Sequence, residues 1–370
     1  MTLADLILIH IRGVGSRTVA HLVNIFGSAD AVLSASVDEL IERAELRPDV
    51  AKLILSADVC VMASQQMEYC HRNNIEMLAA TDVSYPELLR ETPDRPHVLF
   101  VQGNIDALSG HTLAMVGTRE MTPSGATVCN RLVEGLCQSV DDLCIVSGLA
   151  YGVDAASHRA ALTYGATTVA VLASVLPNVS PAPHRALANE IIAKGGAIVS
   201  ELHTNTRQNG TYFVARNRII AGMSCGTLVV ESPASGGSLI TADIADSYGR
   251  TVMAAPGRLT DVASFGTNNL IRSGKARLVL TASDIIDDLG WNSSLRVARH
   301  GQNISPCSRV DELSERHRLV YDIIAASTTT SFVELLNRSQ LSIGELSMVV
   351  MDLELHGVIR SLPGQRYEII

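Results

Sequence analysis

The 370-residue chain is poor in aromatic side chains, which make up 4% of it and include one tryptophan, Trp291. No apolar run approaches the roughly 18 residues of a membrane span, and residues 1–15 lack the basic region of a secretory signal. The seven cysteines form no C-x-x-C pair and are odd in number, which disfavours a disulfide frame or a zinc site. We therefore expect a cytoplasmic protein with reduced thiols, an aliphatic core and no membrane contact.

Motifs for common cofactors are also missing. No G-x-G-x-x-G follows the first strand of the predicted sheet, and G-x-x-x-x-G-K-[ST] and H-E-x-x-H do not occur. We expect neither NAD nor ATP at the usual loops, no metal and no other cofactor. The net charge of −9 excludes a generally basic nucleic-acid binder, but it leaves a local basic surface open.

The middle of the chain alternates between short β-branched runs and stretches of helical apolar spacing. This alternation is typical of βαβ units, and continuous apolar runs are typical of strands buried on both faces. We predict an α/β fold with a mainly parallel, Rossmann-like sheet. The expected strands are 113–117, 144–148, 168–174, 197–201, 227–232, 251–257 and 276–281.

Two smaller regions flank this core. Residues 1–80 are helical in pattern around a Gly-x-Gly turn at Gly13 and Gly15, and Ser36–Leu40 is typical of a helix start. Three helix patterns and a hairpin at the end of the chain predict a winged helix. The expected division is a helical domain at 1–80, the core at 81–291, a linker at 292–312 and a winged-helix-like domain at 313–370.

The predicted strands of the core end in glycines and small polar residues, as in VGTR (116–119) and VSGLAYGVD (146–154). Carboxyl ends of parallel strands form the ligand crevice of such sheets, where glycines let backbone N–H groups approach phosphate. One such turn is ordinary in any α/β fold. Several together, beside arginines, favour a phosphate-bearing ligand.

Local charge supports the same conclusion. Residues 202–230 contain Arg207, Arg216 and Arg218 but no acid, and residues 255–280 carry four basic residues against one aspartate. A solvated basic face would also explain this excess. The segment YFVARNR (212–218) favours binding, because aromatics beside arginines are typical of sites that stack bases and hold a single-stranded backbone.

Three other motifs have simpler explanations. GMSCG (222–226) matches the nucleophile elbow, but a helix is expected before Ser224 and a strand after it, the reverse of what that motif needs. Asp154 is expected to begin a helix and complement its dipole. His158, on the same helix, is expected to be structural or to face phosphate rather than to act as a base.

The terminal modules give weaker indications. IRGVGSR (11–17) is similar to a helix-hairpin-helix turn whose amides contact phosphate, yet residues 1–30 are neutral overall. A purely structural or protein-contact helical domain is therefore at least an equal alternative. In the last module the helix at 342–355 would read a DNA groove, but it carries three acids and no basic residue. A protein contact or scaffold role is favoured there.

From Tyr85 to Leu289 the motifs YPELL…RPHVLFVQGN, VGTR, SGLAYGVDAASHRAAL, FVARNRIIAG, VVESPASGGSLITADIA, GRTVMAAPG and GTNNLIRSGKARLV occur in an order that resembles the bacterial DNA-processing protein A (DprA/Smf) family. The flanking modules also fit that family, whose members often carry a sterile-alpha-motif-like or helix-hairpin-helix-like domain and a winged helix. The resemblance implies a dimeric, non-enzymatic protein. It would bind incoming single-stranded DNA during natural transformation and load the RecA recombinase onto it.

The resemblance also implies site residues. The family's Gly-Thr-Arg turn and Arg-Asn-Arg segment line its DNA pocket, an aromatic residue meets a base, and a second turn and a last loop contribute. The matching positions are Gly117, Thr118, Arg119, Ser147, Gly148, Phe213, Arg216, Asn217, Arg218, Asn268 and Lys275. On this basis the arginines would hold successive phosphates and Phe213 would stack on a base.

The chain departs from the family pattern in three places. VSPAPH (179–184) replaces the usual Tyr-Pro, Val214 stands where proline is common, and Gly210–Tyr212 occupy positions where a basic residue often lies. The last departure is expected to weaken the phosphate contact unless Arg207 substitutes for the basic residue.

Two rival functions remain at this point: a Rossmann-like enzyme or sensor that acts on a nucleotide monophosphate, and a protein-interaction scaffold. Related Rossmann-like enzymes cleave nucleotide monophosphates, but SPASGGSLITAD (232–243) lacks the spacing and the glutamate of their P-G-G-x-G-T-x-x-E segment. A protein scaffold would leave the acid-free arginine segment unexplained.

Overall fold

The computed structural model describes residues 1–56, 59–207, 209–291, 315–325, 330–339, 341–355, 359–362 and 366–369. The chain divides into two compact units, Met1–Asn292 and Ser293–Ile370. The expected linker at 292–312 lies outside the described residues.

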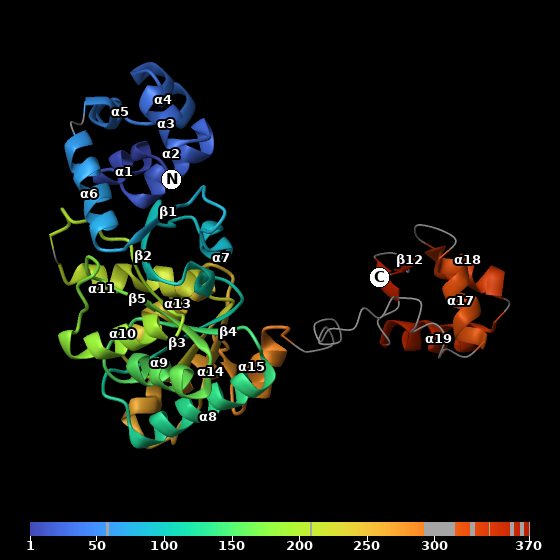
Figure 1. Cartoon of the computed structure of the whole chain (residues 1–370). Coiled ribbons are helices and arrows are strands. Elements are labelled where there is room, and N and C mark those ends of the chain that lie inside the picture. The colour runs from blue at the N-terminus through green and yellow to red at the C-terminus, as the bar shows by residue number, and fades with distance from the viewer. Residues whose placement is uncertain are drawn as a thin grey trace. The chain divides into compact units, whose positions relative to one another are not determined.

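A group of helices, drawn in blue in Figure 1, opens the first unit. The helix predicted to begin at Ser36 does so, because the Ser36 hydroxyl accepts from the Glu39 N–H and the Glu39 carboxylate accepts from the Ser36 N–H. Leu8, Leu22 and Leu40 form part of a separate aliphatic core. The helices are α1 (Leu3–His10), α2 (Ser16–Phe26), α3 (Ala29–Ser34), α4 (Val37–Ala44), α5 (Pro48–Ser56) and α6 (Cys60–Arg72).

A nine-stranded sheet forms the middle of this unit, in the order β1-β2-β6-β5-β4-β3-β7-β8-β9. Neighbours from β6 to β9 pair in parallel, while β1 and β2 are antiparallel, so the mainly parallel prediction is confirmed. All seven predicted strands are present. The strands are β1 (Glu76–Ala79), β2 (Val98–Gly103), β3 (His111–Gly117), β4 (Leu143–Ser147), β5 (Thr167–Val171), β6 (Ala197–Ser200), β7 (Gly226–Glu231), β8 (Thr251–Ala254) and β9 (Arg277–Leu278).

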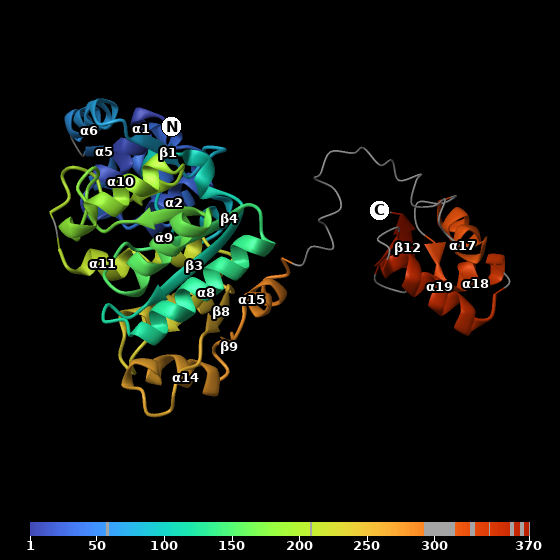
Figure 2. The ribbon, with the colours of Figure 1, turned by 60° about the horizontal axis from the view of Figure 1, so that its bottom comes forward.

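Helices pack on both faces of the sheet (Figure 2). Leu113 and Met115 of β3 belong to a core with α8 and α15, whereas Ala114 and Val116 face the opposite core with α13. This alternation explains the continuous apolar run of β3, since both faces are covered. The helices are α7 (Glu87–Arg90), α8 (Pro123–Ser139), α9 (Val153–Tyr164), α10 (Arg185–Ala193), α11 (Thr211–Ala215), α12 (Asn217–Gly222), α13 (Gly237–Ser247), α14 (Phe265–Arg272) and α15 (Ala282–Asp288).

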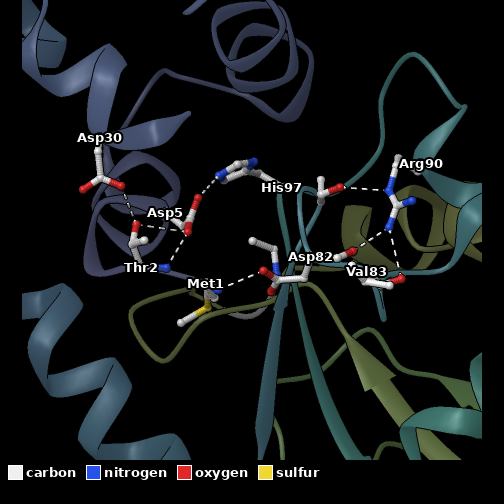
Figure 3. A network of polar contacts seen from close by, with 10 residues as sticks. Met1, Thr2, Asp5, Asp30, Asp82, Val83, Arg90 and His97 are labelled. Carbon is white, nitrogen blue, oxygen red and sulfur yellow. Dashed lines mark hydrogen bonds and ion pairs between the residues drawn. The ribbon is translucent and has the colours of Figure 1, made fainter. Parts of the chain in front are cut away.

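Buried polar contacts join the N-terminal helices to the core (Figure 3). His97, just before β2, lies 2.8 Å from the Asp5 carboxylate of α1, and both side chains are buried. Burial alone would raise the pKa of Asp5, but the hydrogen bonds from His97 and Thr2 outweigh it and lower that pKa. The amino group of Met1 pairs with Asp82 at 2.8 Å. These contacts fix the helical domain against the edge of the sheet.

The second unit has the winged-helix composition that the sequence predicts. Its three helices are followed by an antiparallel hairpin, and Val320, Leu346 and Leu353 lie in its core. On α19 the Met348 and Met351 side chains are exposed, and Glu345 pairs with Arg316 of α17 at 3.0 Å. The elements are α17 (Glu315–Ala325), β10 (Thr330–Ser331), α18 (Phe332–Ser339), α19 (Ile343–Leu355), β11 (Ile359–Leu362) and β12 (Arg366–Ile369).

Candidate nucleic-acid interface

The chain adds strands to the sheet in opposite directions on the two sides of the β3–β7 pair. From β3 the chain passes through α8 to β4 on one side, and from β7 it passes through α13 to β8 on the other. Such a switch point leaves a crevice outside the strand ends, which is where α/β sheets bind their ligands. The turns after β3, β4 and β7 therefore surround the candidate site.

Gly117 ends β3 in a tightly packed turn. A Cβ atom at this position would lie 2.4 Å from Val153 Cγ2, so only glycine fits. The next residue is fixed on both sides, because the Thr118 N–H donates to the Glu231 carbonyl at 2.7 Å and its carbonyl accepts from the Val153 N–H at 3.1 Å. The turn thus presents Arg119 from a rigid base.

Arg119 is exposed and its guanidinium carbon lies 5.9 Å from the centre of the Phe213 ring, over the ring face. Phe213 comes from α11, almost a hundred residues later in the chain. The structure therefore brings together the arginine of the first turn and the aromatic residue of the YFVARNR segment. A cation held on an aromatic face leaves its remaining N–H donors available to a phosphate.

Arg216 is buried, with 6% of the residue exposed. Its Nη1 donates to the carbonyl of Gly148 at 2.6 Å and also to that of Val171, which joins the ends of β4 and β5. Burial lowers the pKa of its guanidinium, Asp154 opposes that effect, and nearby Arg119 adds to it. Arg216 is therefore an interior cation whose guanidinium bonds to main-chain carbonyls, whereas the family resemblance implies that it holds a phosphate.

Gly148 and Ser147 form the turn against which Arg216 packs. A Cβ atom on Gly148 would lie 2.4 Å from the Arg216 guanidinium, and the buried Ser147 hydroxyl donates to the Met115 carbonyl at 2.6 Å. The Ser147 side chain thus points into the sheet. Only the main chain of this turn faces the edge.

Asp154 lies in the first turn of α9, as predicted, and burial raises the pKa of its carboxyl although Arg216 opposes this. His158, one turn further on, is fully buried. Its Nδ1 lies 2.7 Å from the Thr168 hydroxyl, which itself donates to the Ile145 carbonyl, so Nδ1 carries the proton. Burial lowers the pKa of His158 to about 3. His158 is structural, the first of the two roles expected for it.

Arg218 is largely buried and pairs with Glu201, the residue that follows β6. Burial raises the pKa of the Glu201 carboxyl, and Arg218 opposes that effect. Glu201, the residue just before the acid-free segment 202–230, thus neutralises Arg218 of that segment. Arg207 is exposed in the β6–α11 loop, and Asn217 is half-buried at the start of α12.

The last two expected residues lie apart from each other. The Asn268 side chain bonds to the N–H and carbonyl of Gly257 at 3.1 Å each, which braces the loop after β8 at the carboxyl edge. Lys275 follows α14 and precedes β9, so the topology puts it toward the opposite edge. There it pairs with Asp243 at 2.9 Å. The structure does not bring Lys275 together with Arg119.

Sequence reasoning missed one exposed aromatic residue beside this group. Tyr151, in the β4–α9 turn, is 48% exposed and its ring packs edge-on against His184 at 4.8 Å between centres. His184 Nδ1 donates to the carbonyl of Leu149, a residue in the left-handed conformation with φ of 57°. The signal was present in SGLAYGVD, where an aromatic residue stands in a glycine-rich strand end.

The GMSCG motif (222–226) has the flanking helix and strand expected for it. Ser224 is buried between α12 and β7 and donates to the Ile220 carbonyl at 2.9 Å. Within the described ranges, no cluster of three or more His, Cys, Asp or Glu side chains could hold a metal ion. In the same part of the chain, no helix is long and apolar enough to cross a membrane.

This geometry defines a class: a Rossmann-like protein whose strand ends at the switch point present arginine and aromatic side chains rather than a dinucleotide loop. The family model for DNA recombination-mediator protein A matches residues 76–290, and that for the DprA winged helix domain matches residues 308–365. The chain belongs to the DNA recombination-mediator protein A (DprA/Smf) family.

Individual relatives agree with this assignment. The chain is 31% identical to "Protein Smf" of Escherichia coli over 347 residues, which cover 94% of this chain and 89% of the relative. It is similar to the crystal structure of DprA from Streptococcus pneumoniae, with a TM-score of 0.67 and 30% identity over 78% of this chain and 98% of the other. A Helicobacter pylori DNA processing protein A, described for its single-stranded DNA binding mode, matches with a TM-score of 0.52 and 26% identity over 59% of this chain and 96% of the other.

Proposed function

We propose that this protein binds single-stranded DNA along the carboxyl edge of its sheet. The observation that carries the proposal is Arg119, an exposed cation held on the Phe213 ring beside the buried cation Arg216. Two neighbouring positive charges repel each other, and an incoming phosphate relieves that repulsion. The Helicobacter pylori relative, whose structure is described for single-stranded DNA binding, supports the same ligand.

The residues expected at the site then have different roles. Arg119 and Phe213 contact phosphate and base, and the main chain at Gly117, Thr118 and Gly148 lies close to the strand. Arg216 positions the turns after β4 and β5 through their carbonyls. Asn217, Arg218 and Arg207 extend the surface toward the N-terminal helices. Ser147 packs into the sheet and Asn268 braces the loop after β8. Lys275 forms an ion pair with Asp243.

On this basis we further propose a recombination mediator that protects incoming single strands in the cytoplasm and loads the RecA recombinase during natural transformation. It would act as a homodimer, without catalysis and without a cofactor. The family assignment supports a role in DNA recombination. The rival nucleotide-cleaving function has less support, because residues 232–243 lack the glutamate of those enzymes. The neighbouring Glu231 is buried, and its carboxylate accepts from the Thr122 N–H and hydroxyl at the start of α8.

Fluorescence anisotropy of labelled oligo-dT, with single- and double-stranded competitors at two salt concentrations, tests the binding proposal. We expect preference for the single strand and, for about three to five phosphates neutralised, a slope of log K on log salt of roughly −2 to −3.5. Arg119→Ala should weaken binding to every sequence alike and reduce the slope by about 0.7. Arg131→Ala, on the exposed face of α8, is the matched control.

Affinity that is insensitive to salt, or equal losses in Arg119→Ala and Arg131→Ala, would refute this site. Product formed from a nucleotide monophosphate would instead favour the rival enzyme.

A further inference from the structure

A cavity of about 830 Å³ lies where the N-terminal helices meet the loop that follows β6. Its size is within the range of small-molecule sites, which occur preferentially at domain interfaces. One wall is aliphatic and includes Ile9 and Ile11 at the end of α1 and Leu53 and Met62 of α5 and α6. The proposed DNA crevice does not account for this cavity.

The polar side of the cavity is positive. Arg12 enters from the N-terminal domain and Arg207 from the core loop, both are exposed, and neither forms an ion pair with a described residue. Among the described residues that line the cavity there is no aspartate or glutamate. Asn205 and Asn209 add amide donors and acceptors. The lining therefore fits an anion with an apolar, hydrogen-bonding body.

Two histidines at the cavity pack ring against ring, with 4.2 Å between the centres of His10 and His203. His10 is 5% exposed, and its Nδ1 donates to the Leu6 carbonyl at 2.7 Å. Its Nε2 and the Nδ1 of His203 are buried without a hydrogen-bond partner in the described structure. Burial lowers the pKa of His10, and burial together with His10 lowers that of His203 to about 4. Near neutral pH the positive charge here therefore comes from the two arginines.

The cavity adjoins the proposed DNA crevice. Tyr212 lines the cavity, and the next residue, Phe213, contacts Arg119. A neighbouring recess of about 330 Å³ shares Tyr212 and His203 with the cavity and reaches Ser16 and Arg218. The cavity and the recess therefore extend from the N-terminal helices to Tyr212, the residue before Phe213.

We propose that this cavity binds a nucleotide, with its phosphate between Arg12 and Arg207 and its base against Tyr212 and the aliphatic wall. The nucleotide is either free or part of a strand that continues from the crevice past Phe213. The second source rests on the proposed function, whereas the first does not.

The test measures two probes on the full chain: 2′-deoxyadenosine 5′-monophosphate by calorimetry, and labelled (dT)20 by anisotropy. The variants are Arg12→Gln/Arg207→Gln, Tyr212→Leu and the control Arg131→Gln. Loss of the two charge-assisted contacts should weaken binding of at least one probe by about tenfold or more. Tyr212→Leu should weaken the same probe roughly five- to 100-fold, while the control Arg131→Gln leaves it unchanged.

Loss of monophosphate binding supports a free nucleotide, and loss confined to (dT)20 supports a strand that enters the cavity. Changes below twofold for both probes in the double arginine variant and in Tyr212→Leu would overturn the inference. If the wild type binds no (dT)20, the proposed function fails, and the monophosphate alone then decides this inference. Absence of binding for both probes overturns both.

Discussion

Replacing Arg216 by methionine separates its proposed positioning role from direct phosphate contact. Its guanidinium donates to two carbonyls at the ends of β4 and β5, and it opposes the burial that raises the pKa of Asp154. Methionine has a similar length but no donor and no charge. The variant therefore leaves the Gly148 and Val171 carbonyls and the Asp154 carboxyl without that cation.

The expected loss of stability is large. An unsatisfied buried polar group costs about 1–3 kcal/mol, and removing one partner of a buried charge pair costs about 3–5 kcal/mol. Asp154 and Arg216 form no direct ion pair, and methionine fills most of the space of the arginine. We therefore expect the free energy of unfolding to fall by about 3 kcal/mol, the lower end of the second range. Urea unfolding of Arg216→Met and of wild type at pH 7 measures this difference, provided that both proteins show the same dependence of free energy on urea concentration.

Arg119→Met is the matched control, since the same change at an exposed side chain should alter stability by less than about 0.5 kcal/mol. The two variants should also differ in their dependence on salt. Arg119→Met should reduce the slope of log K by about 0.7, and Arg216→Met should leave the slope unchanged. The positioning role would be refuted if Arg216→Met kept the stability of wild type, lost tenfold in DNA affinity and showed a smaller slope of log K on log salt.

Three further predictions concern neighbouring residues. Phe213→Ala should weaken oligo-dT binding by about 1–3 kcal/mol, measured by anisotropy, and an affinity equal to wild type would mean that no base stacks there. His158, whose pKa is about 3 when folded and 6.5 ordinarily, binds a proton only in the unfolded chain between those values, so stability falls as pH falls. Between pH 7 and pH 5 this histidine should lower the free energy of unfolding, measured in urea, by about 2 kcal/mol. The stability of His158→Gln, whose side chain does not titrate, should therefore fall by about 2 kcal/mol less over the same range. Equal pH dependence of the two proteins would contradict this. Gly117→Ala places a Cβ atom 2.4 Å from Val153 Cγ2 and should lower the thermal midpoint, whereas an unchanged midpoint would show that the turn can relax.

The seven core strands and their alternation with helices could be predicted, because local sequence patterns encode them. Leu113–Gly117 and its counterparts are continuous apolar runs, which a parallel sheet requires since both faces are buried. Strand β2 (Val98–Gly103) was missed, because the residues that form it were interpreted as part of a linker. The short strand β1 was also missed and was included in the helical domain at 1–80. Its four residues EMLA carry no β-branched side chain, and pairing with β2 rather than propensity makes them a strand.

The chain's sequence by itself determined the family, the α/β core and the turn residues at the strand ends, because these depend on neighbouring residues and on the order of motifs. Only the tertiary structure decided which arginines remain available to a ligand. Arg216 is buried beneath Gly148, and Arg218 and Lys275 pair with Glu201 and Asp243, partners 17 and 32 residues away. A charge count along the chain includes all of these cations, but electrostatic compensation depends on distances in space, which folding sets.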